Sequence, residues 1–185
     1  MRKVVIVLAF MILAYSLQGA RVAPRRIPTT SFDLVPRHAA CLPDAQGVVT
    51  VTHREDGRGS DSLRLNVRGL PARTGFTVFL TAEDAFASPP FGAAQYIGDF
   101  TTNAAGIGSL QVDTIVGEAF SSTVVGSPPT RLRAELAHLV IWFADPAQTP
   151  DCFNFPGSTP FDGDGEAGPT ALSSQGPTGL EDFPD

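Results

Sequence analysis

The stretch "DSLRLNVRGLPARTGFTVFLTA" (61–82) contains two apolar alternations separated by a glycine and a proline. Every second residue is apolar from Leu63 to Val67, and again from Phe76 to Leu80. Because successive side chains of a strand point to opposite faces, each half predicts a strand with one buried face. Proline cannot donate to a sheet ladder, so the first strand is expected to end before Pro71.

The same period-two pattern extends over much of the chain. Further strands are predicted over 47–54, 95–102, 107–116 and 136–144, and a seventh near 122–125. The sequence "NAAG" (103–106) suits a tight hairpin between two of them. Six to seven short strands with regular turn signals predict an all-β fold, an antiparallel immunoglobulin-like β-sandwich.

The segment before the last of these strands allows two interpretations. The run "LAHLVIWFA" (136–144) is continuously apolar, which is typical of a strand covered on both faces. Residues 130–138 stay open between helix and strand, because Leu132, Leu136 and Leu139 also fit a helical spacing. The β-branched and aromatic residues at 140–143 favour a strand in the second half.

Residues 1–20 have the pattern of a secretory signal peptide. Arg2 and Lys3 precede a short apolar run and then small residues, and two cleavage sites stay open, after Ser16 and after Ala20. The run is shorter than the roughly 20 residues of a comfortable membrane span. We therefore predict a secreted protein, extracellular or at the cell surface, without an integral membrane domain after cleavage; a retained N-terminal anchor is the alternative.

Composition divides the rest of the chain into three parts. Residues 21–40 are rich in proline and arginine and predict an extended lead-in. The β-sandwich domain is expected over 41–155. Residues 156–185 form an acidic tail rich in glycine and proline, which predicts partial disorder.

Only two cysteines are present, Cys41 and Cys152. In an exported protein an even pair without CxxC spacing predicts one disulfide, here joining the two ends of the domain. The bond would close a loop of roughly 110 residues, which stabilises a fold by at most about 4–5 kcal/mol through chain entropy. Two unpaired thiols are the alternative.

The chain carries a net charge of −6, and the excess is not evenly spread. Residues 145–185 contain eight acidic residues and neither Lys nor Arg. Nucleic acids and anionic membrane surfaces are poor partners for such a chain. An extracellular protein or a glycan remains as the expected partner.

Two segments carry a family resemblance. "LRLNVRGLPARTGFTVFLTAED" (63–84) and "IGDFTTNAAGIGSLQV" (97–112) resemble small bacterial extracytoplasmic immunoglobulin-like domains, such as the outer domain of anti-sigma-K factors. The shared features are a strand ending in Gly-Leu-Pro, an aromatic alternating strand and a glycine-containing hairpin. The resemblance implies a sandwich around residues 60–115. It does not imply the regulatory function, because we expect no sigma-binding domain in the few residues before the apolar segment.

The acidic stretch "TPFDGDGEAGPT" (159–170) is a candidate calcium site. Asp162, Asp164 and Glu166 would supply carboxylate oxygens, which are the ligands that hard cations prefer. The stretch does not fit an EF-hand, since Ala167 and Ser173 occupy the positions of its glycine and glutamate. The alternative is a solvated acidic turn.

The segment "EDAFASPPFGAAQ" (83–95) is longer than a hairpin needs and is apolar. Loops at the end of a sandwich often carry recognition, so Phe86, Pro89, Pro90 and Phe91 are the candidate contact residues. Alternatively, both phenylalanines cap the core beneath the loop.

No catalytic motif is found, and no catalytic residue is assigned. The chain lacks G-x-S-x-G and a P-loop, and His38, His53 and His138 share no metal-ligand spacing. We therefore predict a non-catalytic extracellular binding or structural module without a cofactor. The alternatives are a small secreted hydrolase that uses carboxylates, a calcium-dependent binding protein, or a membrane-tethered surface domain.

Overall fold

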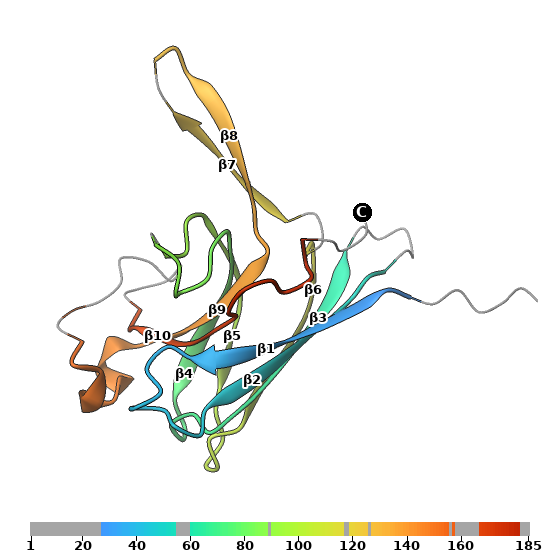
Figure 1. The fold of residues 1–185 in the computed structure, drawn as a ribbon. Helices are drawn as coiled ribbons and strands as arrows, with labels where there is room; N and C mark the ends of the chain where they lie inside the picture. Colours follow the sequence, from blue (N-terminus) through green and yellow to red (C-terminus); the bar gives the residue numbers. More distant parts are fainter. Residues whose placement is uncertain are drawn as a thin grey trace, which may run out of the picture.

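The computed structural model describes residues 27–54, 60–88, 90–116, 119–125, 127–155, 157 and 167–181. These residues form ten strands and two short 3-10 helices (Figure 1). In chain order the elements are β1 (Thr29–Pro36), β2 (Gln46–Thr52), β3 (Asp61–Arg68), β4 (Gly75–Thr81), β5 (Ala94–Thr101), β6 (Gly108–Thr114), β7 (Phe120–Val125), β8 (Thr130–Glu135), β9 (His138–Phe143), η1 (Pro146–Gln148), η2 (Asp151–Phe153) and β10 (Thr170–Ser173).

Eight of the strands form one antiparallel sheet in the order β5-β4-β9-β10-β1-β2-β3-β6. Its two edge strands, β5 and β6, are consecutive in the chain and joined by a tight turn, where Asn103 Oδ1 accepts from the Ala105 and Ile107 N–H groups. The edges stay close, since a side chain at Gly98 of β5 would come within 3.3 Å of Leu110 on β6. The sheet therefore nearly closes on itself.

Strand β1 connects the two halves of this sheet, because it pairs with one strand of each. Residues 29–34 pair with β2, while Val35 and Pro36 pair with Ser173 and Leu172 of β10. One half is thus β1-β2-β3-β6 and the other is β5-β4-β9-β10. The core lies where apolar side chains of both halves are buried, among them Leu34, Val49, Leu63, Leu65, Phe76, Val78, Leu139, Ile141, Phe143 and Leu172.

The six main strands predicted from the sequence are all present, and the seventh is β7. In β3 the burial alternates as expected, with Leu63, Leu65 and Val67 inside. Residues 130–138 resolve as strand β8 followed by the start of β9, so the helical alternative is wrong. Strand β9 is covered on both faces, because Val140 and Trp142 belong to a second apolar cluster outside the main core.

The ends of the chain differ from the prediction. The proposed lead-in 21–40 contains β1, which pairs with β2 instead of preceding the sheet. The proposed tail 156–185 contains β10, whose four residues are all buried between β9 and β1. The composition of these segments predicts weak local structure, but long-range pairing on both sides of β10 outweighs it. The signal-peptide prediction for 1–20 lies outside the described residues.

Strands β7 and β8 form a separate two-stranded ribbon, called the arm below, which projects from the eight-stranded sheet (Figure 1). At its root, Val116, Ala119 and Leu136 are buried in the main core. The Leu136 N–H donates to the Ala119 carbonyl at 2.9 Å, which fixes the point where the arm leaves the body.

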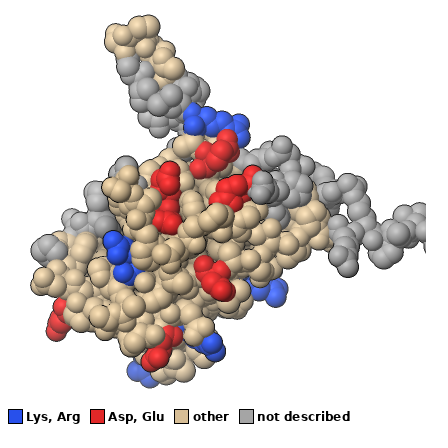
Figure 2. Space-filling model, in the orientation of Figure 1, with Lys and Arg blue, Asp and Glu red and all other residues tan. Residues whose placement is uncertain are grey.

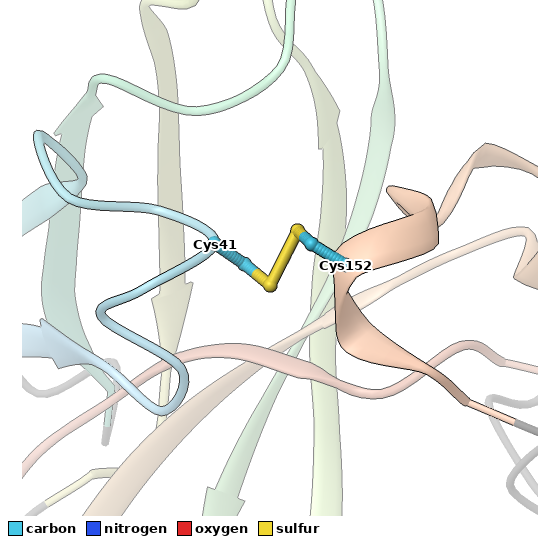
Figure 3. The surroundings of a disulfide bond; sticks show 2 residues. All are labelled: Cys41 and Cys152. Carbon is cyan, nitrogen blue, oxygen red and sulfur yellow. A yellow bond between two sulfur atoms is a disulfide. The ribbon is translucent and has the colours of Figure 1, made fainter.

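The predicted disulfide between Cys41 and Cys152 is confirmed (Figure 3). Cys41 lies in the turn between β1 and β2, and Cys152 lies in η2, with 5.7 Å between their α-carbons. Beside the bond, Phe153 packs edge-on against His38 at 4.9 Å and against Phe143 at 5.3 Å. The bond therefore joins the β1–β2 turn to the segment that follows β9.

Replacing both cysteines by serine is expected to lower the free energy of unfolding by about 2–4 kcal/mol, because the bridge spans 111 residues of the unfolded chain. Urea unfolding of the oxidised protein and of the double variant measures the difference. The oxidised protein treated with reductant should match the variant. Equal stability of all three samples would contradict the stapling role.

Candidate functional site

The segment 83–93, called the β4–β5 loop below, is held by the carboxylate of Asp84. Its Oδ1 accepts hydrogen bonds from the Phe86 and Ala87 N–H groups, both at 2.8 Å. Its Oδ2 accepts from the Gly176 N–H at 3.1 Å, just beyond β10. One side chain thus shapes the start of the loop and ties it to the C-terminal strand.

Two further contacts hold the loop through Ala85. The Arg37 Nε donates to the Ala85 carbonyl at 3.0 Å, and the Ala85 N–H donates to the Ser173 Oγ at the same distance. Arg37 follows β1 and Ser173 ends β10, so the two central strands of the sheet both anchor the loop. Sequence reasoning missed these anchors, because only the long-range pairing of β1 with β10 brings them beside the loop.

The two phenylalanines of the loop lie in different environments. The Phe91 ring packs edge-on against Trp142, with 5.4 Å between centroids. Phe86 is 36% exposed, and the Arg37 guanidinium lies 5.1 Å from its ring centroid. Pro90 is also exposed, while Pro89 lies outside the described residues. Of the two alternatives for the loop, covering the core thus fits Phe91, and a surface position fits Phe86.

Beneath the loop lies the second apolar cluster, centred on Trp142. This side chain is 7% exposed and packs 4.8 Å from the Phe79 ring. Within the described part of the chain its indole N–H has no hydrogen-bond partner. An unpaired buried donor is unfavourable, so the cluster contains one polar group that the described residues leave unsatisfied.

Asp84, His138 and Ser174 bring together the three residue types of a hydrolytic triad. The His138 Nδ1 lies 3.3 Å from the Ser174 Oγ. However, Ser174 is only 1% exposed, and its Oγ also accepts from the Leu139 N–H at 3.2 Å. A hydroxyl that is shielded from solvent and bound to the backbone is not placed to attack a substrate. This group joins β10 to β9 and to the loop.

The environment of Asp84 favours its ionised form. Partial burial opposes ionisation and raises the pKa, but the N–H groups of Gly176, Phe86 and Ala87, together with the charge of His138, outweigh that effect. The pKa of Asp84 is therefore lower than its ordinary value of 3.8.

The remaining histidines do not meet at a common site. The ring of His38 packs on Phe153, whereas the His53 Nδ1 lies 3.0 Å from the Asp61 Oδ1. Asp61 also accepts from the Val116 N–H at 3.0 Å, near the root of the arm. Among the described residues no three His, Cys, Asp or Glu side chains gather as metal ligands would.

The proposed calcium ligands Asp162, Asp164 and Glu166 lie outside the described residues, so that site stays a prediction. Two acids of the described segment before them are Asp145 and Asp151. Asp145 caps η1 by accepting from the Ala147 N–H at 2.8 Å. Asp151 lines a surface hollow of about 420 Å³ beside η1 and η2, where it is the one charged residue among the lining side chains that the structure describes.

Comparison with family models and with curated proteins finds no match to this chain. Within the described ranges, no helix has the length and apolar character that a membrane crossing requires.

Replacing Asp84 by asparagine should loosen the β4–β5 loop at neutral pH. Because the folded-state pKa is lowered, the stabilisation by Asp84 is present above pH 3.8 and is lost as the pH falls through the folded value. Trp142 is the only tryptophan and contacts Phe91, so its fluorescence reports on the loop. We expect an acid-induced fluorescence change in the wild type, and its absence in Asp84→Asn.

Asp113→Asn is the matched control, since this exposed carboxylate pairs with Arg54 far from the loop in sequence. It should leave the fluorescence transition unchanged. Identical acid titrations of Asp84→Asn and the wild type would contradict the anchoring role of Asp84.

Proposed function

We propose that this chain is a secreted, non-catalytic extracellular binding module on an immunoglobulin-like β-sandwich. The signal-peptide pattern of residues 1–20 and the disulfide both support export. The division of the sheet into two halves around one core supports the sandwich. The short, buried polar side chains beside the loop serve to hold strands together, which supports binding over catalysis.

One observation carries the proposal: Phe86 is exposed on a loop whose backbone is fixed on both sides of it. The N–H groups of Phe86 and Ala87 are bound by Asp84, and Ala85 is bound by Arg37 and Ser173. A preorganised loop loses little conformational entropy on association, so the contacts of its exposed ring contribute more fully to the binding free energy.

The side chains of Phe86 and Arg37 favour a protein partner. Phe86 presents an apolar ring without a hydrogen-bonding group, and Arg37 lies against that ring. Aromatic and arginine side chains are the usual energetic centres of protein interfaces. We therefore propose a partner surface with an apolar pocket for Phe86 and an acceptor or carboxylate for Arg37. A glycan is the second candidate class.

Replacing Phe86 by alanine should abolish partner binding without unfolding the protein. The protein recovered from the medium is immobilised and presented with the extracellular proteins of its source, and retained species are quantified for wild type and variant. Because Phe86 is 36% exposed and packs against Arg37, its removal should lower the free energy of unfolding by about 1 kcal/mol, which leaves the protein folded.

Phe91→Ala is the matched control, because it removes the same side chain from the inner side of the loop. It should lower stability by disturbing the Trp142 cluster. A set of retained proteins that is the same for wild type and Phe86→Ala would contradict the assigned surface. Failure of the chain to reach the medium would contradict export.

A further inference from the structure

We propose that the arm joins two copies of this chain, with β7 of one copy pairing antiparallel to β7 of the other. This inference is independent of the function assigned to the β4–β5 loop. The occupant of the open edge is a second copy, and the product is a four-stranded sheet in the order β8-β7-β7-β8.

The arm lacks the support that a ribbon of this kind needs. Its strands pair with each other from Phe120–Glu135 to Val125–Thr130, and neither outer edge pairs with another strand in the described part of the chain. A two-stranded ribbon is at best marginally stable in water, whereas three or more strands support one another. A second copy would supply the missing strands.

The two open edges differ in charge. Strand β7, "FSSTVV", has no charged residue, whereas β8, "TRLRAE", has three. Proteins commonly protect an edge strand with charges or proline, and β8 carries this protection. Strand β7 has β-branched and hydroxyl residues without a charge or a proline, which makes it the edge suited to pairing.

Two-fold symmetry also distinguishes β7 from β8 as the strand that contacts the second copy. When identical strands pair antiparallel, the residue at the axis faces its own copy, and residues equally far from it face each other. Centring β8 on Leu132 would set Arg131 opposite Arg133, and centring it on either arginine would set that arginine opposite itself. Like charges directly opposite are destabilising, so these three registers of β8 are unfavourable, whereas no register of β7 sets two like charges opposite each other.

When β7 is paired with its own copy in the same way, the residues that face each other are compatible. Centring on Ser122 sets Phe120 opposite Val124, and Ser121 opposite Thr123. Aromatic with β-branched and hydroxyl with hydroxyl are favourable cross-strand combinations. The sequence of β7 is therefore complementary to itself.

The position of the arm suits such a contact. The chain carries a net charge of −6, so two copies repel one another as whole molecules, while the arm holds its neutral edge away from the body (Figure 1). At the root, acidic and basic side chains meet (Figure 2), where Arg133 Nε lies 2.6 Å from Glu135. Phe120 is 47% exposed there, with the Arg133 guanidinium 4.1 Å from its ring centroid, so the contact would begin beside a partly exposed apolar side chain.

The test replaces Ser122 by glutamate. In the arm, position 122 lies opposite Arg133, so the new carboxylate gains an opposite charge across the ribbon. In the proposed pair it faces its own copy or an uncharged residue at the interface. Sedimentation velocity of the exported protein over a concentration series should show a dimer for the wild type and only monomer for Ser122→Glu.

Thr130→Glu is the matched control, because it adds the same charge to an exposed position on β8 and should leave the dimer intact. A wild type that is monomeric at every concentration would overturn the proposal. This holds even if the β7 edge of that monomer binds a peptide of another sequence, because the proposed occupant is a second copy. A dimer that persists equally in both variants would overturn the assignment to β7.

Discussion

The structure depends on the insertion of β10 between β9 and β1. Strand β10 comes last in the chain, yet it bridges the two halves of the sheet, pairing with β9 over a bulge and with Val35 and Pro36 of β1. Its residues are buried, and Leu172 belongs to the main core. Without β10, the backbone groups of β9 and the end of β1 would lose their partners, which is unfavourable inside a protein.

The loop that carries the proposed function depends on the same insertion. Ser173 and Gly176 bind Ala85 and Asp84, so the loop has its fixed shape only when the C-terminal segment is in place. The disulfide acts just beyond the same end of β1 that pairs with β10, where it joins the β1–β2 turn to η2. The shape of the loop and the pairing of the sheet are therefore coupled through one short strand, whereas the arm is anchored separately at the buried residues of its root.

Local sequence patterns correctly predict the strands whose burial follows from their own sequence. Strand β3 follows its alternation, and the apolar run of β9 correctly indicates burial on both faces. Strand β10, "TALS", is too short to show a period, and its burial comes from neighbours distant in sequence. The number and context of the cysteines are enough to predict the disulfide. Phe86 and Phe91, in contrast, look alike in the sequence, and only their tertiary contacts separate them.

Native-state hydrogen exchange of the backbone amides tests the insertion of β10 most directly. The Ser174 N–H donates to the Leu139 carbonyl at 2.9 Å, and the Arg37 N–H donates to the Ala171 carbonyl at 3.1 Å. We expect the amides of Arg37 and Ser174 to exchange as slowly as those of β9, because both open only on global unfolding. Exchange at the rate of an unstructured chain at these two positions would contradict the insertion of β10.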